Sequence, residues 1–139
     1  MSHQASPAIT MSSRDFDRLD ALLDMPQWQH NATAQALRQE LDRANVVAPE
    51  KIPANLVTMN STVTCVEEIG HKEHVLTLCY PAEADAAKGR VSVLAPVGAA
   101  LLGLTLGQTI DWTTPDGHRL RLRVTAITFQ PEAAGQFHR

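Results

Sequence analysis

The stretch from Val91 to Ile110 constrains the fold most, because twenty consecutive residues carry no charge. A membrane-spanning helix needs about 20 mostly apolar residues, so the length alone would allow one. However, Pro96, Gly98 and Gly103 each interrupt or end a helix. We therefore interpret the stretch as several short elements, and we expect no membrane segment.

The short elements follow from the local residue types. The segment Val91–Leu94, with valine at two of its four positions, favours a short buried strand. Pro96 suits the first turn of a helix, where its missing N–H is not needed, and the helix would cover residues 97–102. Gly103 is a natural left-handed stop, and after a glycine-containing turn residues 109–113 resume a strand. This order of strand, helix, turn and strand predicts the centre of a compact α+β domain.

The chain before this stretch begins with a polar segment and a helix. Met1–Met11 has no periodicity, and we expect a loose tail. Ser12 and Asp15 have the spacing of a capping box, with aspartate in place of the usual Glu or Gln. The helix should end near Met25, because Pro26 follows. Its apolar stripe consists of Phe16, Leu19, Leu22 and Leu23.

A second helix is predicted from about Thr33 to Asn45, after the loop Asp24–Ala32. Its apolar residues recur at steps of three, four and three, which is the spacing of a coiled-coil seam. They are Ala34, Leu37, Leu41 and Ala44. Helices this short are not stable alone, so we expect them to form an antiparallel, coiled-coil hairpin.

The segment of residues 48–53 contains two prolines and is expected to be a stiff linker. We predict a hairpin unit over residues 1–47 and a sheet domain over residues 48–139. Alternating patterns beyond the linker favour strands over Val57–Val66, residues 75–80 and residues 120–129. A break in phase predicts a bulge near Thr125, and the arginines of the last strand should face outward.

Length, net charge and cysteine content limit the kinds of partner and the cellular compartment that we expect. With 139 residues the chain forms one domain or a small domain with an appendage. The net charge of −3 and the lack of a basic cluster argue against autonomous nucleic-acid binding. No signal peptide is evident, which favours the cytoplasm. Cys65 and Cys79 are then expected to be free buried thiols, although a bridge between adjacent strands is the alternative.

Catalytic and metal-binding patterns find little support. His71 and His74 stand three residues apart, but a metal would need a third ligand on a shared face, so we interpret them as loop histidines. No serine or cysteine lies in a nucleophile elbow, and no glycine-rich loop has phosphate-binding spacing. We expect no enzyme, no catalytic residue, no metal and no cofactor.

Four segments resemble known families. The stretch of residues 92–104 resembles the C-terminal domain of the Gre transcription factors. Thr58–Ser61 and Gln130–Gly135, together with Glu40–Ala44, resemble the Rnk family, whose members are called regulators of nucleoside diphosphate kinase. The resemblance covers residues 13–137 and implies an FKBP-like domain, in which an antiparallel sheet wraps one short helix.

The resemblance also implies a partner. Gre factors act on bacterial RNA polymerase, where acidic residues at the tip of a long coiled coil help to hold a catalytic magnesium. Here each hairpin helix spans about 20 Å, and its tip has one carboxylate, Asp24. We therefore expect a non-enzymatic regulator that binds near the secondary channel of the polymerase, competes with Gre-type factors, and affects the kinase indirectly.

Four residues are candidates for contacting that partner, namely Asp24, Trp28, Leu94 and Pro96. Three of them have a structural alternative. Asp24 shares a face with Asp17 and Asp20 that is expected to be solvated. Trp28 would cap the small core of the hairpin. Pro96 matches the proline of a Gre motif implicated in polymerase contact, but it also suits helix initiation.

Two other functions are consistent with the sequence. An FKBP-like domain suggests a peptide-binding protein or a prolyl isomerase, although fold alone is a weak warrant and such a site needs an aromatic-lined pocket. Leftover apolar surface on the hairpin suggests a homo-oligomeric scaffold. Neither alternative has a recognisable motif.

Overall fold

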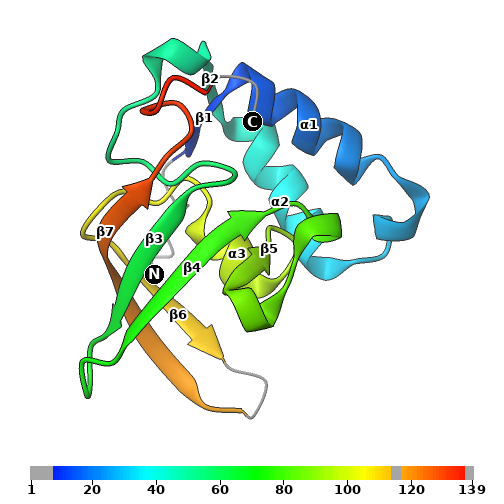
Figure 1. The fold of residues 1–139 in the computed structure, drawn as a ribbon. Coiled ribbons are helices and arrows are strands. Elements are labelled where there is room, and N and C mark those ends of the chain that lie inside the picture. Colours follow the sequence, from blue (N-terminus) through cyan, green and yellow to red (C-terminus); the bar gives the residue numbers. More distant parts are fainter. Residues whose placement is uncertain (1–7, 114–116, 137–139) are drawn as a thin grey trace, which may run out of the picture.

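A curled five-stranded sheet forms the centre of the molecule, and a helical hairpin is attached to one side of it (Figure 1). The computed structural model describes residues 8–113 and 117–136. The strand order in the sheet is β5-β4-β3-β7-β6. These strands are β3 Thr62–Glu67, β4 Glu73–Cys79, β5 Arg90–Ser92, β6 Thr109–Thr113 and β7 Arg119–Phe129. The fold is mixed α+β, as predicted.

Most of the sheet is antiparallel, but one edge is not. β3 pairs with β4 and β7, and β6 pairs with β7, all in antiparallel register. β5 pairs with β4 in parallel, so the prediction of a purely antiparallel sheet is wrong at this edge. The cause is the connection of residues 81–89, whose two short 3₁₀ turns carry the chain back before β5 begins. FKBP-like and coiled-coil geometry stay predictions.

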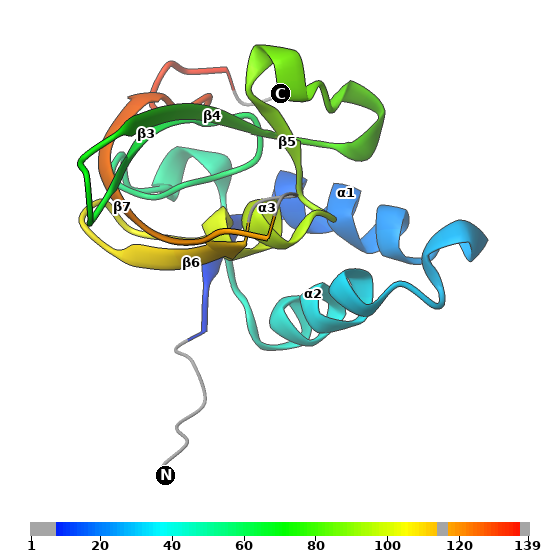
Figure 2. The ribbon, with the colours of Figure 1, turned by 90° about the horizontal axis from the view of Figure 1, so that it is seen from below.

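The long strand β7 curves because its register shifts twice against β3. One shift leaves Thr125 unpaired between Val124 and Ala126, where the sequence predicts a bulge. A second shift, which was not predicted, lies at Thr128. Bulges increase local twist and bend a strand, which fits the curl of the sheet (Figure 2). The arginines of β7 are exposed, as predicted.

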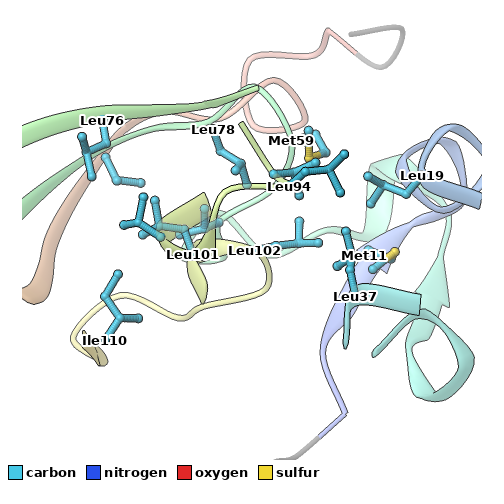
Figure 3. Packing of buried hydrophobic residues seen from close by; sticks show 14 of the residues in the cluster. Met11, Leu19, Leu37, Met59, Leu76, Leu78, Leu94, Leu101, Leu102 and Ile110 are labelled. Atoms are coloured by element: carbon cyan, nitrogen blue, oxygen red, sulfur yellow. The ribbon is translucent and has the colours of Figure 1, made fainter. Parts of the chain in front are cut away.

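The short helix α3, Pro96–Leu101, lies at the open side of the curl and contacts β4, β5 and β6 (Figure 2). Pro96 occupies the first turn, and Gly103 has φ of +79°, so the predicted start and stop are both confirmed. Leu101 is fully buried in the cluster that the sheet encloses (Figure 3). Among the described residues no helix is long and apolar enough to cross a membrane.

The first predicted strand is shorter than expected. It begins at Thr62 rather than Val57, because residues 58–61 form a tight turn. The Ser61 N–H donates to the Thr58 carbonyl at 3.1 Å, and the Thr58 N–H donates to the Ser61 hydroxyl at 3.0 Å. Asn60 adopts φ of +68° within this turn, which a short polar side chain tolerates.

The hairpin consists of α1, Ser13–Leu23, and α2, Ala32–Arg43, which lie side by side (Figures 1 and 2). The Ser12 side chain accepts the Asp15 N–H at 3.0 Å, so the predicted N-terminal cap is confirmed. Asn31 caps α2 in the same way. The apolar stripes of both helices face inward, with Leu19, Leu23, Ala34, Leu37 and Leu41 buried.

The expectation of a loose tail is wrong for residues 8–11. Thr10–Ser12 forms strand β1, which pairs in parallel with β2, Asn45–Val47, just after the hairpin. Met11 is only 1% exposed, since its side chain enters the shared core. Burying a side chain of this size stabilises by about 1.5–3 kcal/mol, which offsets part of the conformational entropy lost when the short strand forms. Residues 1–7 lie outside the described part of the chain.

One hydrophobic cluster joins the hairpin to the sheet. Met11, Leu19 and Leu37 from the hairpin side belong to the same cluster as Met59 and Leu94 (Figure 3). Between the two parts, residues 48–53 contain the 3₁₀ turn Pro49–Lys51, and Ile52 is 9% exposed. The division at residue 47 stays a prediction, but removal of the hairpin would expose part of this shared core.

Replacing Gly103 with valine is expected to destabilise the protein by about 2–4 kcal/mol, because two effects add. A β-branched residue resists positive φ, and a Cβ at this position would lie 2.6 Å from the Cβ of Ile9. Urea denaturation measures the loss. Gly107→Val, at φ of +94° with open space around it, isolates the backbone effect and should cost less. Equal losses would show that Ile9 does not crowd Gly103.

Candidate partner-binding surface

The tip of the hairpin is an ionic cluster centred on Arg38. The Arg38 guanidinium from α2 pairs with the carboxylate of Asp20 and, at 3.0 Å, with the carboxylate of Asp24. It also donates to the Asp20 carbonyl at 3.2 Å. The predicted acidic face is therefore partly neutralised from the other helix. Sequence reasoning missed Arg38, although its position between Leu37 and Leu41 places it beside the inward stripe.

Side-chain amides close the same tip. Gln29 donates from Nε2 toward the carbonyls of Leu23, Asp24 and Met25 at 3.3–3.4 Å. These carbonyls are at the C-terminal end of α1, where intrahelical partners are lacking. The Gln35 amide in turn donates to the Gln29 carbonyl at 3.1 Å. The tip is therefore closed by hydrogen bonds from these two side-chain amides to backbone carbonyls.

Trp28 lies in the 3₁₀ turn Pro26–Trp28 and is half-buried against the hydrophobic cluster. This placement agrees with a cap on the hairpin core. Its ring lines a shallow depression of about 380 Å³ together with Leu23, Asp24 and Arg38. The indole Nε1 is buried and has no hydrogen-bond partner among the described residues. Asp24 and Trp28 thus share one surface at the tip.

The other two candidate residues lie elsewhere, at the start of α3. Leu94 is 7% exposed and packs in the core beside Met59 (Figure 3), so its side chain does not face a partner. Pro96 is exposed at the first turn of α3. The Leu94 N–H donates to the Ser92 hydroxyl at 3.0 Å, which fixes the turn that presents Pro96.

A buried polar network brings two distant motifs together. The Thr58 hydroxyl donates to a carboxylate oxygen of Glu132 at 2.8 Å, across 74 residues of sequence. The Thr58 and Ser61 hydroxyls lie 2.9 Å apart. The Gln130 amide donates to the Leu56 carbonyl at 2.7 Å. The C-terminal turn is therefore fastened to the segment before β3, a pairing that no spacing in the sequence indicates.

Asp15 extends this network to α1. Its carboxylate accepts the Met59 N–H at 3.2 Å, and the residue is only 1% exposed. Burial, with a smaller contribution from the nearby charge of Glu132, raises the pKa of the Asp15 carboxyl to about 7, although the Met59 hydrogen bond and the charges of Arg18 and Arg14 oppose the shift. The second oxygen of Asp15 has no hydrogen-bond partner among the described residues. Folding therefore favours the protonated acid.

Substituting Asp15 with asparagine is expected to remove a pH dependence of stability. The folded-state pKa lies above the ordinary value of 3.8, so the stabilisation is full below that value and is lost as pH rises through 7. The parent protein should lose about 2–3 kcal/mol between pH 5 and pH 8 through this group. Asp15→Asn keeps an acceptor for the Met59 N–H and cannot ionise.

Urea titrations of both proteins at pH 5 and pH 8 measure this difference. The exposed Asp17→Asn is the matched control and should follow the parent protein. If Asp15→Asn changes with pH as much as the parent does, Asp15 is not the titrating group.

The histidine and cysteine side chains of the described residues do not form a metal site or a disulfide. In residues 8–113 and 117–136 no group of three or more His, Cys, Asp or Glu side chains could hold a metal ion. His74 is instead hydrogen-bonded to Glu67 at 2.7 Å and packs edge-on against Trp112. Cys65 and Cys79 lie on adjacent strands as buried free thiols.

Comparisons with known proteins match both parts of the chain. A family model for the C-terminal domain of transcription elongation factors GreA/GreB matches residues 52–129, and a model for the Rnk N-terminus matches residues 7–47. The "Regulator of nucleoside diphosphate kinase" of Escherichia coli strain K12 is 43% identical over 131 residues, covering 94% of this chain and 96% of the relative.

Elongation factors named GreA match a smaller share of this chain. The "Transcription elongation factor GreA" of Azorhizobium caulinodans is 36% identical over 83 residues, covering 60% of this chain and 53% of the relative. Among solved structures, a "Prokaryotic transcription elongation factor GreA/GreB from Nitrosomonas europaea" is 44% identical with a TM-score of 0.80, covering 89% of this chain and 100% of that one. A Gfh1 protein of Thermus thermophilus, at 20% identity and a TM-score of 0.51, shares the fold.

Proposed function

This chain belongs to the Rnk family of regulators, which carry a GreA/GreB-type C-terminal domain, and on that basis we propose that it is a non-enzymatic regulator of transcription. It would act in the cytoplasm by binding bacterial RNA polymerase near the secondary channel. The relatives named as GreA are transcription elongation factors, which supports this class of partner. An effect on nucleoside diphosphate kinase would then be indirect.

The short hairpin with its neutralised tip is the observation that carries the proposal. α1 and α2 have 11 and 12 residues, so the hairpin reaches about 17 Å from its base. Magnesium needs oxygen ligands, usually one or two carboxylates. Here Asp24 is already paired with Arg38. These two features favour a hairpin that enters the mouth of the channel but supplies no carboxylate for binding magnesium.

A protein that occupies the channel entrance without stimulating cleavage would act as a competitor of Gre-type factors. If this chain docks through its Gre-type domain, it would exclude Gre-type factors from the same surface while stimulating no transcript cleavage itself. Pro96, exposed at the start of α3, is the proposed docking contact on that domain, with Leu94 supporting it from inside. Asp24 and Trp28 would face the channel entrance.

Co-purification of the full-length chain with RNA polymerase tests the binding step. A truncated chain is unsuitable, because Met11, Leu19 and Leu37 belong to the shared core. Pro96→Glu places a carboxylate at an exposed helix start, where it is tolerated, and should weaken binding by about tenfold or more. Ile69→Glu adds the same charge at a side chain that is 90% exposed and should bind normally. Absence of binding by the intact chain would overturn the proposal.

A further inference from the structure

A small polar pocket lies on the outer face of the sheet. Thr62 and Thr77 are on this face, since they alternate with the buried Val63, Leu76 and Leu78. The pocket has a volume of about 240 Å³ and forms where β3 and β4 meet the connection of residues 81–89. Its polar lining consists of Asn60, Thr62, Thr77, Cys79, Glu83 and Arg90.

The floor of the pocket is polar and uncharged. The Thr62 and Thr77 hydroxyls are hydrogen-bonded to each other at 2.8 Å across the two strands. Each hydroxyl oxygen can accept more than one hydrogen bond, so the pair can still bind a ligand. Burial raises the pKa of the Cys79 thiol, with Glu83 adding to the shift and Arg90 opposing it. The neutral thiol donates a hydrogen bond to the Val91 carbonyl. It therefore adds no negative charge beside the Arg90 guanidinium.

The two charged residues are held on a well-bonded connection. Asp85 and Arg90 exchange two backbone hydrogen bonds of 3.0 and 2.9 Å. Gly89, at φ of +70°, accepts the Thr77 N–H at 2.8 Å, which ties the connection to β4. Within the part of the chain that the structure describes, neither Glu83 nor Arg90 takes part in an ion pair. Opposite charges therefore line one small pocket without neutralising each other directly.

From this arrangement we propose that the pocket binds a small zwitterion of the free α-amino acid class. The ligand carboxylate would pair with the Arg90 guanidinium, and its ammonium group with the Glu83 carboxylate. A ligand with only one of these charges would be repelled by the like charge in the pocket. The volume is below the 300–1,000 Å³ typical of drug-sized ligands, so a molecule of amino-acid size fills the pocket better than a nucleotide would.

The affinity is expected to be modest. Both charged residues are exposed, and exposed ion pairs each contribute about 1 kcal/mol or less. Two such contributions, about 2 kcal/mol together, correspond to a dissociation constant of the order of tens of millimolar. Binding at this level would respond to cellular pools of free amino acids, which are abundant small zwitterions. The pocket contains none of the four residues that we propose to contact RNA polymerase, because it lies outside the hairpin tip and α3.

Nuclear magnetic resonance titration of the full chain with L-alanine tests the proposal. The amide signals of Thr62, Thr77, Cys79 and Arg90 should shift in a saturable way. Acetate and methylammonium, which each carry one of the two charges, should bind about fivefold or more weakly. Arg90→Gln and Glu83→Gln should each weaken alanine binding by about fivefold. Lys88→Gln, on the same connection but outside the pocket, should have no effect.

Two results would overturn the proposal. If no saturable shift occurs up to about 100 mM alanine, the pocket is not a site for amino acids. If acetate binds as tightly as alanine, and Glu83→Gln changes neither the acetate affinity nor the alanine affinity, the pocket is a simple anion site at Arg90.

Discussion

Replacing Gly98 with alanine is expected to lower the free energy of unfolding by about 3–5 kcal/mol, although alanine is normally the better helix former. A Cβ at position 98 would overlap the carbonyl oxygen of Ser92 and lie 2.7 Å from its carbonyl carbon. These are backbone atoms at the end of β5, so no side-chain rotation can relieve the overlap. Either α3 or the end of β5 must move, and both are part of the core.

Urea denaturation measures this loss. Ala99→Gly, the next position in α3, removes a Cβ and should cost only about 1 kcal/mol through helix propensity. If Gly98→Ala is within about 1 kcal/mol of the parent protein, the close approach of α3 to Ser92 does not exist.

Truncating Leu101 to alanine is expected to cost about 2–5 kcal/mol, the usual range for a buried leucine. Leu101 is fully buried on α3, where the curled sheet surrounds it (Figure 3). The substitution removes apolar contacts and leaves a cavity that the sheet can close only in part. Leu106→Ala, at a side chain that is 44% exposed, should cost less than about 1 kcal/mol. Equal losses for the two variants would place Leu101 outside the core.

The local elements of the fold were predictable because their signals are local. Ser12 at the start of α1, Pro96 at the start of α3 and Gly103 at its end act through the backbone of a few neighbouring residues. The helical stripes were predictable for the same reason, since 3.6-residue spacing places them on one face. The bulge at Thr125 followed from a change of phase within a single strand.

The features that were not predictable depend on contacts between distant segments. The pairing of β1 with β2 joins residues on both sides of the hairpin, and neither three-residue strand has a pattern of its own. The parallel direction of β5 depends on how residues 81–89 turn. The need for glycine at position 98 arises only because Ser92 packs against it.

The candidate surface was predictable in part. The sequence indicated Asp24 and Trp28 at the hairpin tip, and the structure places them on one depression. It did not indicate that Arg38 binds Asp24, because a cross-helix ion pair depends on how the two helices are rotated. Nor did it separate Leu94, which is buried, from Pro96, which is exposed. The role of these four residues in binding stays a prediction.

Transcript cleavage in backtracked RNA polymerase complexes, stimulated by a Gre-type factor and titrated with the full-length chain, tests the proposed function most directly. Increasing amounts of the chain should suppress the stimulated cleavage and produce none alone. Asp24→Asn should not change the cleavage rate measured with the chain alone, since the Asp24 carboxylate is paired with Arg38 and stimulates no cleavage. If the unmodified chain accelerates cleavage and Asp24→Asn abolishes that acceleration, the hairpin reaches the active centre and the proposal of binding without chemistry is wrong.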